Sequence, residues 1–144
     1  METKEPLAKF HANINVKGQL VIPKKDREVL GLERDDVVEI IVRTIEREDS
    51  RLRILGSAYV VVKLSSRGLI TIPEEIRKAL NITPNTVLEV LVIGFHKFNE
   101  LITEKGKTIL TQLNSRPFRI ITPDEEEKLL KKSTAYYSYS ISKS

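Results

Sequence analysis

The sequence predicts a mainly β fold in which two similar units share one hydrophobic core. The chain has 144 residues, which suffices for one compact domain but not for two of ordinary size. One segment recurs after fifty residues, and apolar residues alternate in each copy as they do in half-buried strands. A unit of about thirty residues buries too little apolar surface to stand alone, so we expect the copies to form one pseudo-symmetric barrel or sandwich.

The repeat aligns residues 16–42 with residues 66–92, and eight of these 27 positions are identical. Many of the other positions hold conservative pairs, such as Leu20 and Ile70. Chance is a poor explanation for this agreement over one unbroken stretch. The identical pairs are Gly18 and Gly68, Ile22 and Ile72, Pro23 and Pro73, Arg27 and Arg77, Leu30 and Leu80, Val37 and Val87, Glu39 and Glu89, and Val42 and Val92.

Each unit begins with an alternating strand and a glycine turn. Gly18 and Gly68 can take a positive φ between two strand-like runs, which indicates a hairpin. The basic residue before each glycine, Lys17 or Arg67, would then stand at the hairpin tip. The alternating apolar residues are Phe10, Ala12 and Ile14 in the first copy and Val60, Val62 and Leu64 in the second.

A short helix and a buried strand complete each unit. Pro23 and Pro73 end the second strand and can occupy the first helical position, because that position needs no N–H. The helix should end at Gly31 or Asn81, since both tolerate a left-handed conformation. The expected apolar helix face is Val29 and Leu30, or Ile76, Ala79 and Leu80, and the expected strands cover 37–45 and 86–93.

Composition argues against several classes of protein. The chain has no cysteine, which excludes disulfides and thiolate chemistry, and its two histidines, His11 and His96, belong to no spaced set of metal ligands. No phosphate-binding glycine loop occurs, so we expect no enzyme, no catalytic residue, no metal and no cofactor. Without an apolar run of roughly 20 residues or a signal-like N-terminus, a cytoplasmic protein with no membrane partner is expected.

The two units share a longer motif. The first copy reads Lys17-Gly18-Gln19-Leu20-Val21-Ile22-Pro23, followed by Arg27 to Leu32, and the second runs from Arg67-Gly68-Leu69 through Ile72-Pro73 to Ile76-Arg77-Lys78-Ala79-Leu80. This motif resembles the AbrB, SpoVT and MazE class of swapped-hairpin transcription factors over about residues 8–93. The resemblance implies an interleaved swapped-hairpin β-barrel made from two intrachain repeats, about 8–56 and about 58–93. The sequence departs from the class pattern at Asp26, Leu69 and Asn81.

The resemblance also implies where DNA would bind, because this class contacts DNA through basic residues near the hairpin turn and on the short helix. Residues 17–27 hold four basic residues and one acid, while residues 67–78 hold three basic residues and two acids, so the first copy should present the stronger DNA face. Alternatively, Lys24, Lys25 and Lys78 are solvated helix residues. Arg27 and Arg77 then form structural ion pairs, for instance with Glu39 and Glu89. The implied DNA-binding residues are Lys17, Gln19, Lys24, Lys25, Arg27, Arg67, Arg77 and Lys78.

The remaining chain predicts a C-terminal packing or oligomerisation extension over 94–132, α-helical or mixed α/β. An apolar stripe favours a helix from about Phe95 to Asn114, whereas Gly106 favours a hairpin that pairs 101–102 with 109–110. A strand over 118–121 should precede a helix to about Lys132 with Thr122 as N-cap and Glu125 in a capping box. Residues 133–144, rich in Ser and Tyr, should form a flexible tail.

Three functions fit these expectations. The first is a DNA-binding transcription regulator, whose partner is duplex DNA. Its C-terminal segment is a candidate contact between the chains of a homodimer. The second is an antitoxin whose C-terminal segment binds a toxin. Typical toxin-binding tails are acidic, however, whereas residues 94–144 carry nine basic and six acidic residues. The third is an architectural protein that coats DNA with little sequence preference.

Overall fold

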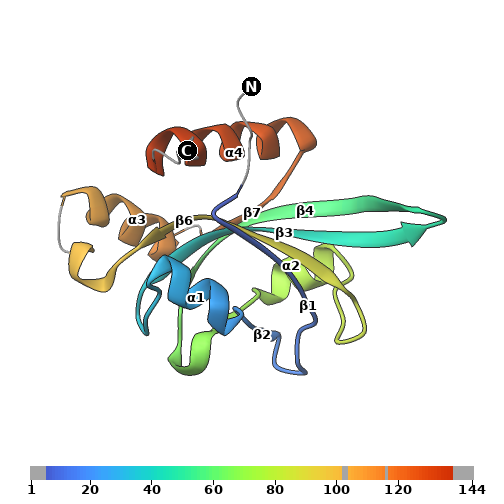
Figure 1. The fold of residues 1–144 in the computed structure, drawn as a ribbon, viewed down its shortest axis with the longest axis horizontal. Helices are drawn as coiled ribbons and strands as arrows, with labels where there is room; N and C mark the ends of the chain where they lie inside the picture. The colour runs from blue at the N-terminus through green and yellow to red at the C-terminus, as the bar shows by residue number, and fades with distance from the viewer. Residues whose placement is uncertain (1–5, 102–103, 116, 138–144) are drawn as a thin grey trace, which may run out of the picture.

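In a computed structural model, the described residues form seven strands, four α-helices and two short 3-10 turns (Figure 1). The structure describes residues 6–101, 104–115 and 117–137. The strands are β1 (Ala8–Ala12), β2 (Gln19–Val21), β3 (Val37–Glu48), β4 (Arg51–Lys63), β5 (Leu69–Thr71), β6 (Leu88–His96) and β7 (Phe118–Ile121). The helices are α1 (Lys24–Leu30), α2 (Glu74–Ala79), α3 (Glu104–Ser115) and α4 (Pro123–Tyr137), and the 3-10 turns are η1 (Ser66–Gly68) and η2 (Phe98–Glu100).

The strands form a five-stranded sheet, in the order β1-β6-β3-β4-β7, and a two-stranded sheet of β2 and β5. Every pairing is antiparallel, and most join segments far apart in the chain: β1 pairs with β6, and β2 pairs with β5. The turn at Gly18 forms as expected, with the Gly18 N–H donating to the Asn15 carbonyl over 3.0 Å. The hairpin expected there does not form, however, because β1 and β2 pair with β6 and β5 and not with each other.

The expected barrel is not closed among the strands that the structure describes. β2 and β5 have three residues each and pair only with one another, so they cannot join the ends of the larger sheet. β7 extends the larger sheet beside β4 and leaves β1 and β7 as its two edges. The molecule is therefore mainly β, with two antiparallel sheets and short helices.

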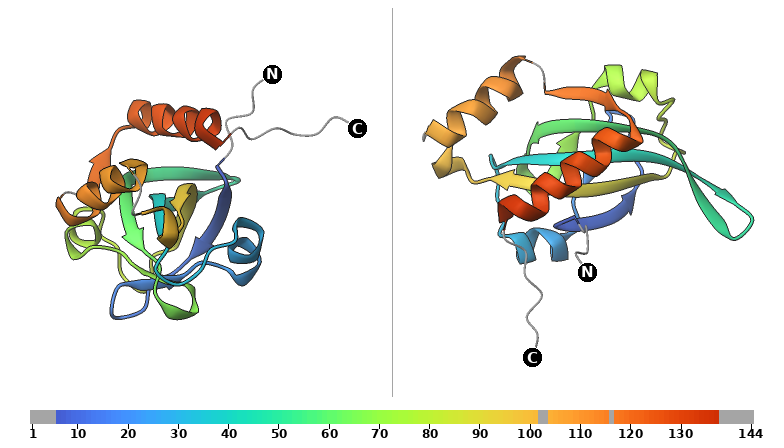
Figure 2. Two further views of the ribbon diagram at one scale, coloured as in Figure 1. Left: turned by 90° about the vertical axis from the view of Figure 1, so that its left-hand side faces the viewer. Right: turned by 90° about the horizontal axis from the view of Figure 1, so that it is seen from above.

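The five-stranded sheet separates two hydrophobic clusters. One cluster lies between the sheet's lower face in Figure 1 and the elements β2, β5 and α2. It includes Leu20, Ile22, Ile70, Ile72 and Ile76. The other lies on its upper face, which includes Ile121 of β7, and contains Leu101, Ile109 and the leucines of α4. Successive β3 residues point to opposite faces, and Val37, Val38, Ile40, Ile41 and Val42 are all fully buried, as expected for a strand covered on both sides. Figures 1 and 2 show α4 lying across the upper face.

The two short helices end near Gly31 and Asn81 as predicted, but they correct the expectation for their first residues and for part of their apolar faces. Pro23 and Pro73 precede their helices, with ψ of 140° and 141°, and the Pro23 carbonyl accepts the first helical bond from Arg27. Leu30, Leu80 and Ile76 pack inward as predicted. Val29 is 76% exposed and Ala79 is also exposed, because helices of seven and six residues turn only one narrow side to the core. Gly31 and Asn81 take left-handed φ values of 66° and 54° after the helices.

The C-terminal extension is mixed α/β. β6 continues to His96, and Ile109 and Leu110 lie within α3, so the expected hairpin is wrong and the helix starts later than Phe95. The strand over 118–121 is confirmed as β7, which pairs with β4. Thr122 Oγ1 accepts from the Glu125 N–H over 3.2 Å, which confirms the capping box. α4 runs to Tyr137, past the predicted end at Lys132 and into the predicted tail, whose residues 138–144 lie outside the described part.

β3 and β4 also project beyond the rest of the sheet as a two-stranded ribbon. The pairing of β3 with β6 ends at Thr44, and the pairing of β4 with β7 ends at Ser57, so the strands beyond these points are paired only with each other among the described strands. A register shift between Thr44 and Ile45 marks the base of the ribbon. Its tip points away from the body in Figure 1.

Candidate nucleic-acid interface

The turns that carry Lys17 and Arg67 meet at the small β2–β5 sheet. Gly18 and Gly68 are buried and have φ values of 79° and 74°, which glycine adopts without steric cost. Each glycine carbonyl accepts a hydrogen bond from the other unit: the Ile72 N–H donates to Gly18 over 2.8 Å, and the Ile22 N–H donates to Gly68 over 2.9 Å. The two turns are thus fixed to one another through the backbone.

Arg27 of α1 and Arg77 of α2 also contact the residues around the β2–β5 sheet. Arg27 Nε donates to the Ile22 carbonyl over 2.9 Å, and Arg77 Nε donates to the Ile72 carbonyl over 3.1 Å. Each side chain also lies against the turn glycine of the other unit. A methyl group on Gly18 would come within 2.6 Å of Arg77 Nε, and one on Gly68 would collide in the same way with Arg27. The sequence placed both arginines among the DNA contacts, but the structure holds them half-buried beneath the turns.

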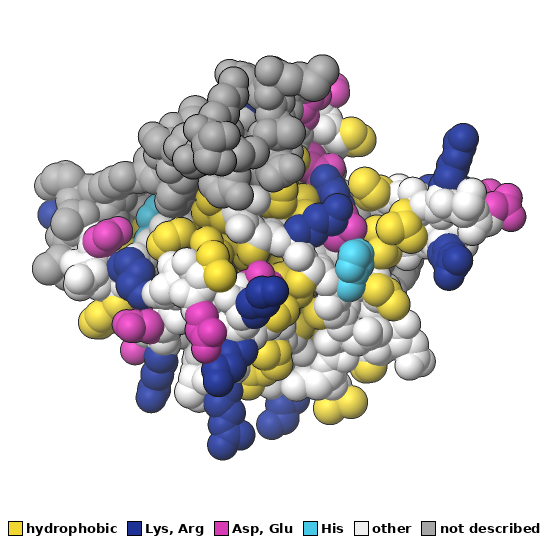
Figure 3. All heavy atoms as spheres, in the orientation of Figure 1, with side chains coloured by type: hydrophobic (Ala, Val, Ile, Leu, Met, Phe, Trp, Pro, Cys, Tyr) yellow, Lys and Arg dark blue, Asp and Glu magenta, His cyan; other side chains and the backbone are white. Residues whose placement is uncertain are grey.

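The remaining basic residues point outward. Lys17 and Arg67 are exposed beside the buried glycines, and Lys24, Lys25 and Lys78 are exposed on the helices. Their ion pairs are confined to the helix surface: Lys24 with Glu28 at 4.0 Å and Lys78 with Glu74 at 3.2 Å, both between well-exposed side chains. Such pairs contribute little, so these cations stay available for an anionic ligand. In Figure 3, dark-blue side chains extend from the lower surface, where Figure 1 shows α1, β2 and the loops.

Asn15, which the sequence reading passed over, shapes the first turn. Its Oδ1 accepts from the backbone N–H groups of Lys17 and Gln19, each over 2.9 Å, and its Nδ2 donates to Gln19 Oε1 over 3.1 Å. Asn favours this type of local turn, and its place three residues before Gly18 is the signal that could have identified it. The Gln19 side chain is therefore engaged within the turn.

The grouping of charge in space differs from its grouping along the chain. The turn of the first unit lies against Arg77 of α2, and the turn of the second unit lies against Arg27 of α1. Arg67 together with α1 gives four basic and two acidic residues, a net +2, and Lys17 together with α2 gives three basic and two acidic residues, a net +1. Because Lys17 and Arg67 carry the same charge, this exchange of turns leaves the charge difference between the groups unchanged, and the group that contains α1 stays the more basic one.

Glu39 and Glu89 do not pair with Arg27 and Arg77 among the described contacts, so these ion pairs are wrong, while the solvated lysines of that alternative stay a prediction. Glu39 accepts from Tyr59 Oη at 2.5 Å and lies 2.8 Å from His96 Nε2. Burial, followed by the charge of Glu39, raises the pKa of Tyr59 well above its usual value.

Glu89 has three partners, which lie on β1 and β3. Arg43 Nη1 donates to it over 2.7 Å, His11 Nε2 lies at 3.1 Å, and Lys9 Nζ lies at 3.7 Å. Burial opposes ionisation of Glu89, but the hydrogen bond from Arg43 and the charges of Lys9 and Arg43 hold its pKa below the usual value. Arg43 also binds Glu126, which links β3 to α4. These groups stabilise the scaffold at a distance from the turns.

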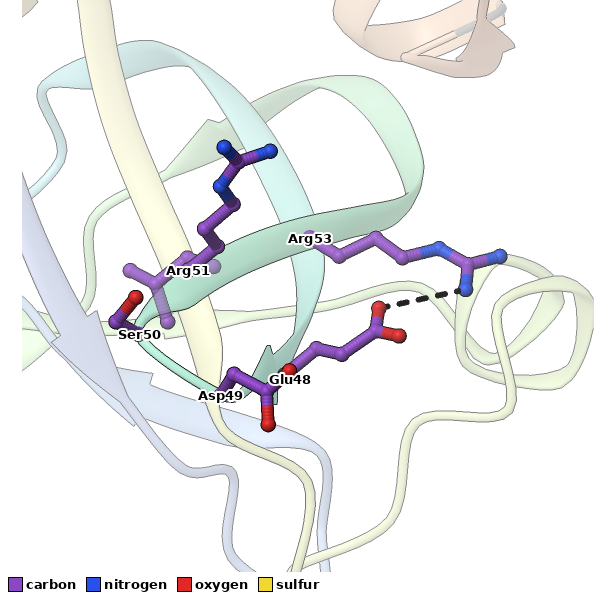
Figure 4. Close-up of a pocket in the computed structure, with 6 residues that line it drawn as sticks. Glu48, Asp49, Ser50, Arg51 and Arg53 are labelled. Atoms are coloured by element: carbon purple, nitrogen blue, oxygen red, sulfur yellow. Dashed lines mark ion pairs between the residues drawn. The ribbon is translucent and has the colours of Figure 1, made fainter.

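The rest of the described surface offers little for other chemistry. No cluster of three or more His, Cys, Asp or Glu residues suited to a metal ion occurs in the described residues. A hollow of about 550 Å³ at the ribbon tip is lined by residues 48–53, and Figure 4 shows its one marked ion pair, Arg53 with Glu48 at 3.8 Å. Another, of about 480 Å³, contains Arg43, which Glu89 and Glu126 already engage. None of the described helices is long and apolar enough to span a membrane.

Comparison with known proteins relates this chain to a family of antitoxins and to one solved structure. Residues 61–94, from β4 through β6, match the family described as antidote-toxin recognition MazE, bacterial antitoxin. The solution structure of PHS018 from Pyrococcus horikoshii is 30% identical to this chain, with a TM-score of 0.54. The match covers 65% of this chain and 96% of PHS018. None of the curated proteins matches the chain in sequence.

Proposed function

Because the chain belongs to one family with PHS018 and carries a MazE-type domain at residues 61–94, we propose that it is a DNA-binding regulator. The domain alone fits either an antitoxin or a DNA-binding regulator. One observation favours DNA binding: two turns and two helices with exposed basic side chains lie together on the side of the large sheet opposite α3 and α4 (Figure 1).

The proposed contacts are mainly to phosphates. Lys17, Lys24, Lys25, Arg67 and Lys78 have exposed cationic ends, and a cation that neutralises a phosphate releases a bound counterion. The side chain of Gln19 is held by Asn15, so we assign it the role of fixing the first turn at the DNA surface. In this proposal, residues 8–56 and 58–93 form the two interleaved units, and β1, β6, β3 and β4 carry them as one rigid platform.

The experiment measures binding of a fluorescent duplex by anisotropy between about 50 and 200 mM salt, the range over which phosphate contacts are strongly weakened. The double variant Lys17→Ala/Arg67→Ala should weaken binding on all sequences and reduce the salt slope by about two, at about one per lost contact. The matched control is Lys128→Ala/Lys131→Ala, which removes the same charge from exposed positions on α4. If wild type binds no duplex at low salt, or if both double variants lose affinity equally, the proposal is wrong.

The antitoxin remains a second candidate, because the matching family is one of antitoxins. The match covers residues 61–94 and does not reach α3 and α4, which form the segment proposed to bind a toxin. Co-expression with a small protein encoded next to this chain separates the two functions. A stable complex that is lost when α3 and α4 are altered, without loss of DNA binding, would favour the antitoxin. Equal affinity for random and genomic fragments would instead indicate an architectural protein.

A further inference from the structure

The positions of Arg27 and Arg77 assign them a role that their sequence context does not suggest. We propose that they are positioning residues that act across the two units. Arg77 fixes the turn that presents Lys17, and Arg27 fixes the turn that presents Arg67. The inference rests on the proposed DNA-binding function, but the crossed arrangement can be tested without DNA.

The first argument is that each arginine is committed to the scaffold. Arg27 Nε and Arg77 Nε donate to the carbonyls of Ile22 and Ile72, two residues with no exposed surface. A bond to a fixed acceptor removes most of the freedom of a long side chain, and the planar guanidinium then has one orientation. An ammonium group cannot reproduce this, because lysine has no Nε–H and no planar end.

The second argument is that each guanidinium closes over a turn of the other unit. Gly18 and Gly68 leave no room for a Cβ because Arg77 and Arg27 occupy that space. The same glycines accept hydrogen bonds from Ile72 and Ile22, which are the residues whose carbonyls bind the arginines. Each turn is therefore held from two sides by the other unit, and a shift of the arginine must shift the turn.

The third argument concerns the cation that each turn presents. Lys17 and Arg67 come directly before the held glycines, so the backbone of the glycine sets where the basic side chain starts. Arg67 itself has φ 65°, which for a residue other than glycine is uncommon and needs support from its surroundings. Lys17 is not one of the residues with positive φ in the described part of the chain, so its turn carries no such strain. The turn of Arg67 should consequently depend more on its arginine than the turn of Lys17 does.

The test is a set of double-mutant cycles on duplex affinity, made with Arg77→Lys and Arg27→Lys so that charge is kept. In the wild-type background Lys17→Ala should weaken binding about five-fold, and in the Arg77→Lys background less than about two-fold, since coupled residues are not additive. Lys17→Ala should keep its full effect in the Arg27→Lys background. Arg67→Ala should show the reverse pattern, with loss of its effect only in the Arg27→Lys background.

Additive effects in all four combinations would overturn the proposal, and so would coupling of Lys17 with Arg27 of its own unit. A second cycle uses urea unfolding with Gly18→Ala and Arg77→Lys. Because both changes disturb one contact, the midpoint of the double variant should fall by clearly less than the sum of the single shifts, whereas Gly18→Ala with Arg27→Lys should be additive. If no duplex binds, the proposed function fails while this cycle still decides whether the turns are held across units.

Discussion

The two units keep the turn glycine and the arginine but hold their helices in different ways. In the second unit, Ile76 of α2 is 2% exposed and anchors the helix in the hydrophobic cluster. The corresponding residue of α1 is Asp26, and α1 has no buried residue. The end of α1 is instead tied by Lys97, which binds the Gly31 carbonyl and Asp36. Contacts at the turns are thus retained while helix anchoring differs, as expected if the turns carry the function.

The largest expected difference between the units is at the two corresponding helix positions. Ile76→Ala should lower the free energy of unfolding by about 3 kcal/mol, because it leaves a cavity in a packed cluster. Asp26→Ala should cost only about 0.5 kcal/mol, the loss of a favourable charge in the first helical turn. Urea denaturation of both variants measures the difference. Equal losses would show that α1 is anchored in the same way as α2.

A smaller difference is expected at Lys97 and Arg47, which occupy corresponding positions fifty residues apart. Lys97→Met removes the cation beside Asp36, a carboxylate that is 1% exposed and keeps the N–H groups of Glu33 and Phe98 as partners. The cost should be about 1–2 kcal/mol. Arg47→Met, on the exposed ribbon, should stay within about 0.5 kcal/mol. A thermal melt that ranks Arg47 above Lys97 would contradict this account of α1.

The buried carboxylate Glu89 should make the stability of the folded chain depend on acid. The pKa of Glu89 is lowered in the folded protein, so its stabilisation is present above the unfolded value of 4.5 and is lost as pH falls below it. Glu89→Gln should therefore flatten the loss of stability below about pH 4.5, measured by urea unfolding at several pH values. An unchanged pH dependence in Glu89→Gln would show that the network around Arg43 is not responsible.

The smallest effect is expected where the helices end. Asn81 has φ 54° at the position where the first unit has Gly31, so Asn81→Gly should stabilise the chain by about 0.5 kcal/mol. Gly31→Asn should destabilise it by a similar amount, since nothing lies within 4 Å of the Gly31 Cβ position and only backbone conformation is at issue. Paired thermal melts would show opposite shifts, and two shifts of the same sign would argue against the equivalence of these positions.

The local features could be predicted from the sequence because they depend on single residues. The turn glycines, the left-handed residues after the helices and the capping box at Thr122 are all of this kind. The exchange of strand partners could not be read in the same way, since alternation shows which face of a strand is buried but not which strand lies beside it. The contact between Arg77 and Gly18 depends on that exchange, so the sequence could not show that this arginine lies against a turn of the other unit.

The most direct test of the account is an NMR titration of the isotope-labelled chain with a short duplex at low salt. The account predicts that the largest changes in backbone amide shifts occur at residues 15–19 and 65–69 and at the starts of α1 and α2. Amides of α4 and of the ribbon over 45–56 should change little. Changes confined to α4 or to the ribbon, with none at the two turns, would contradict it.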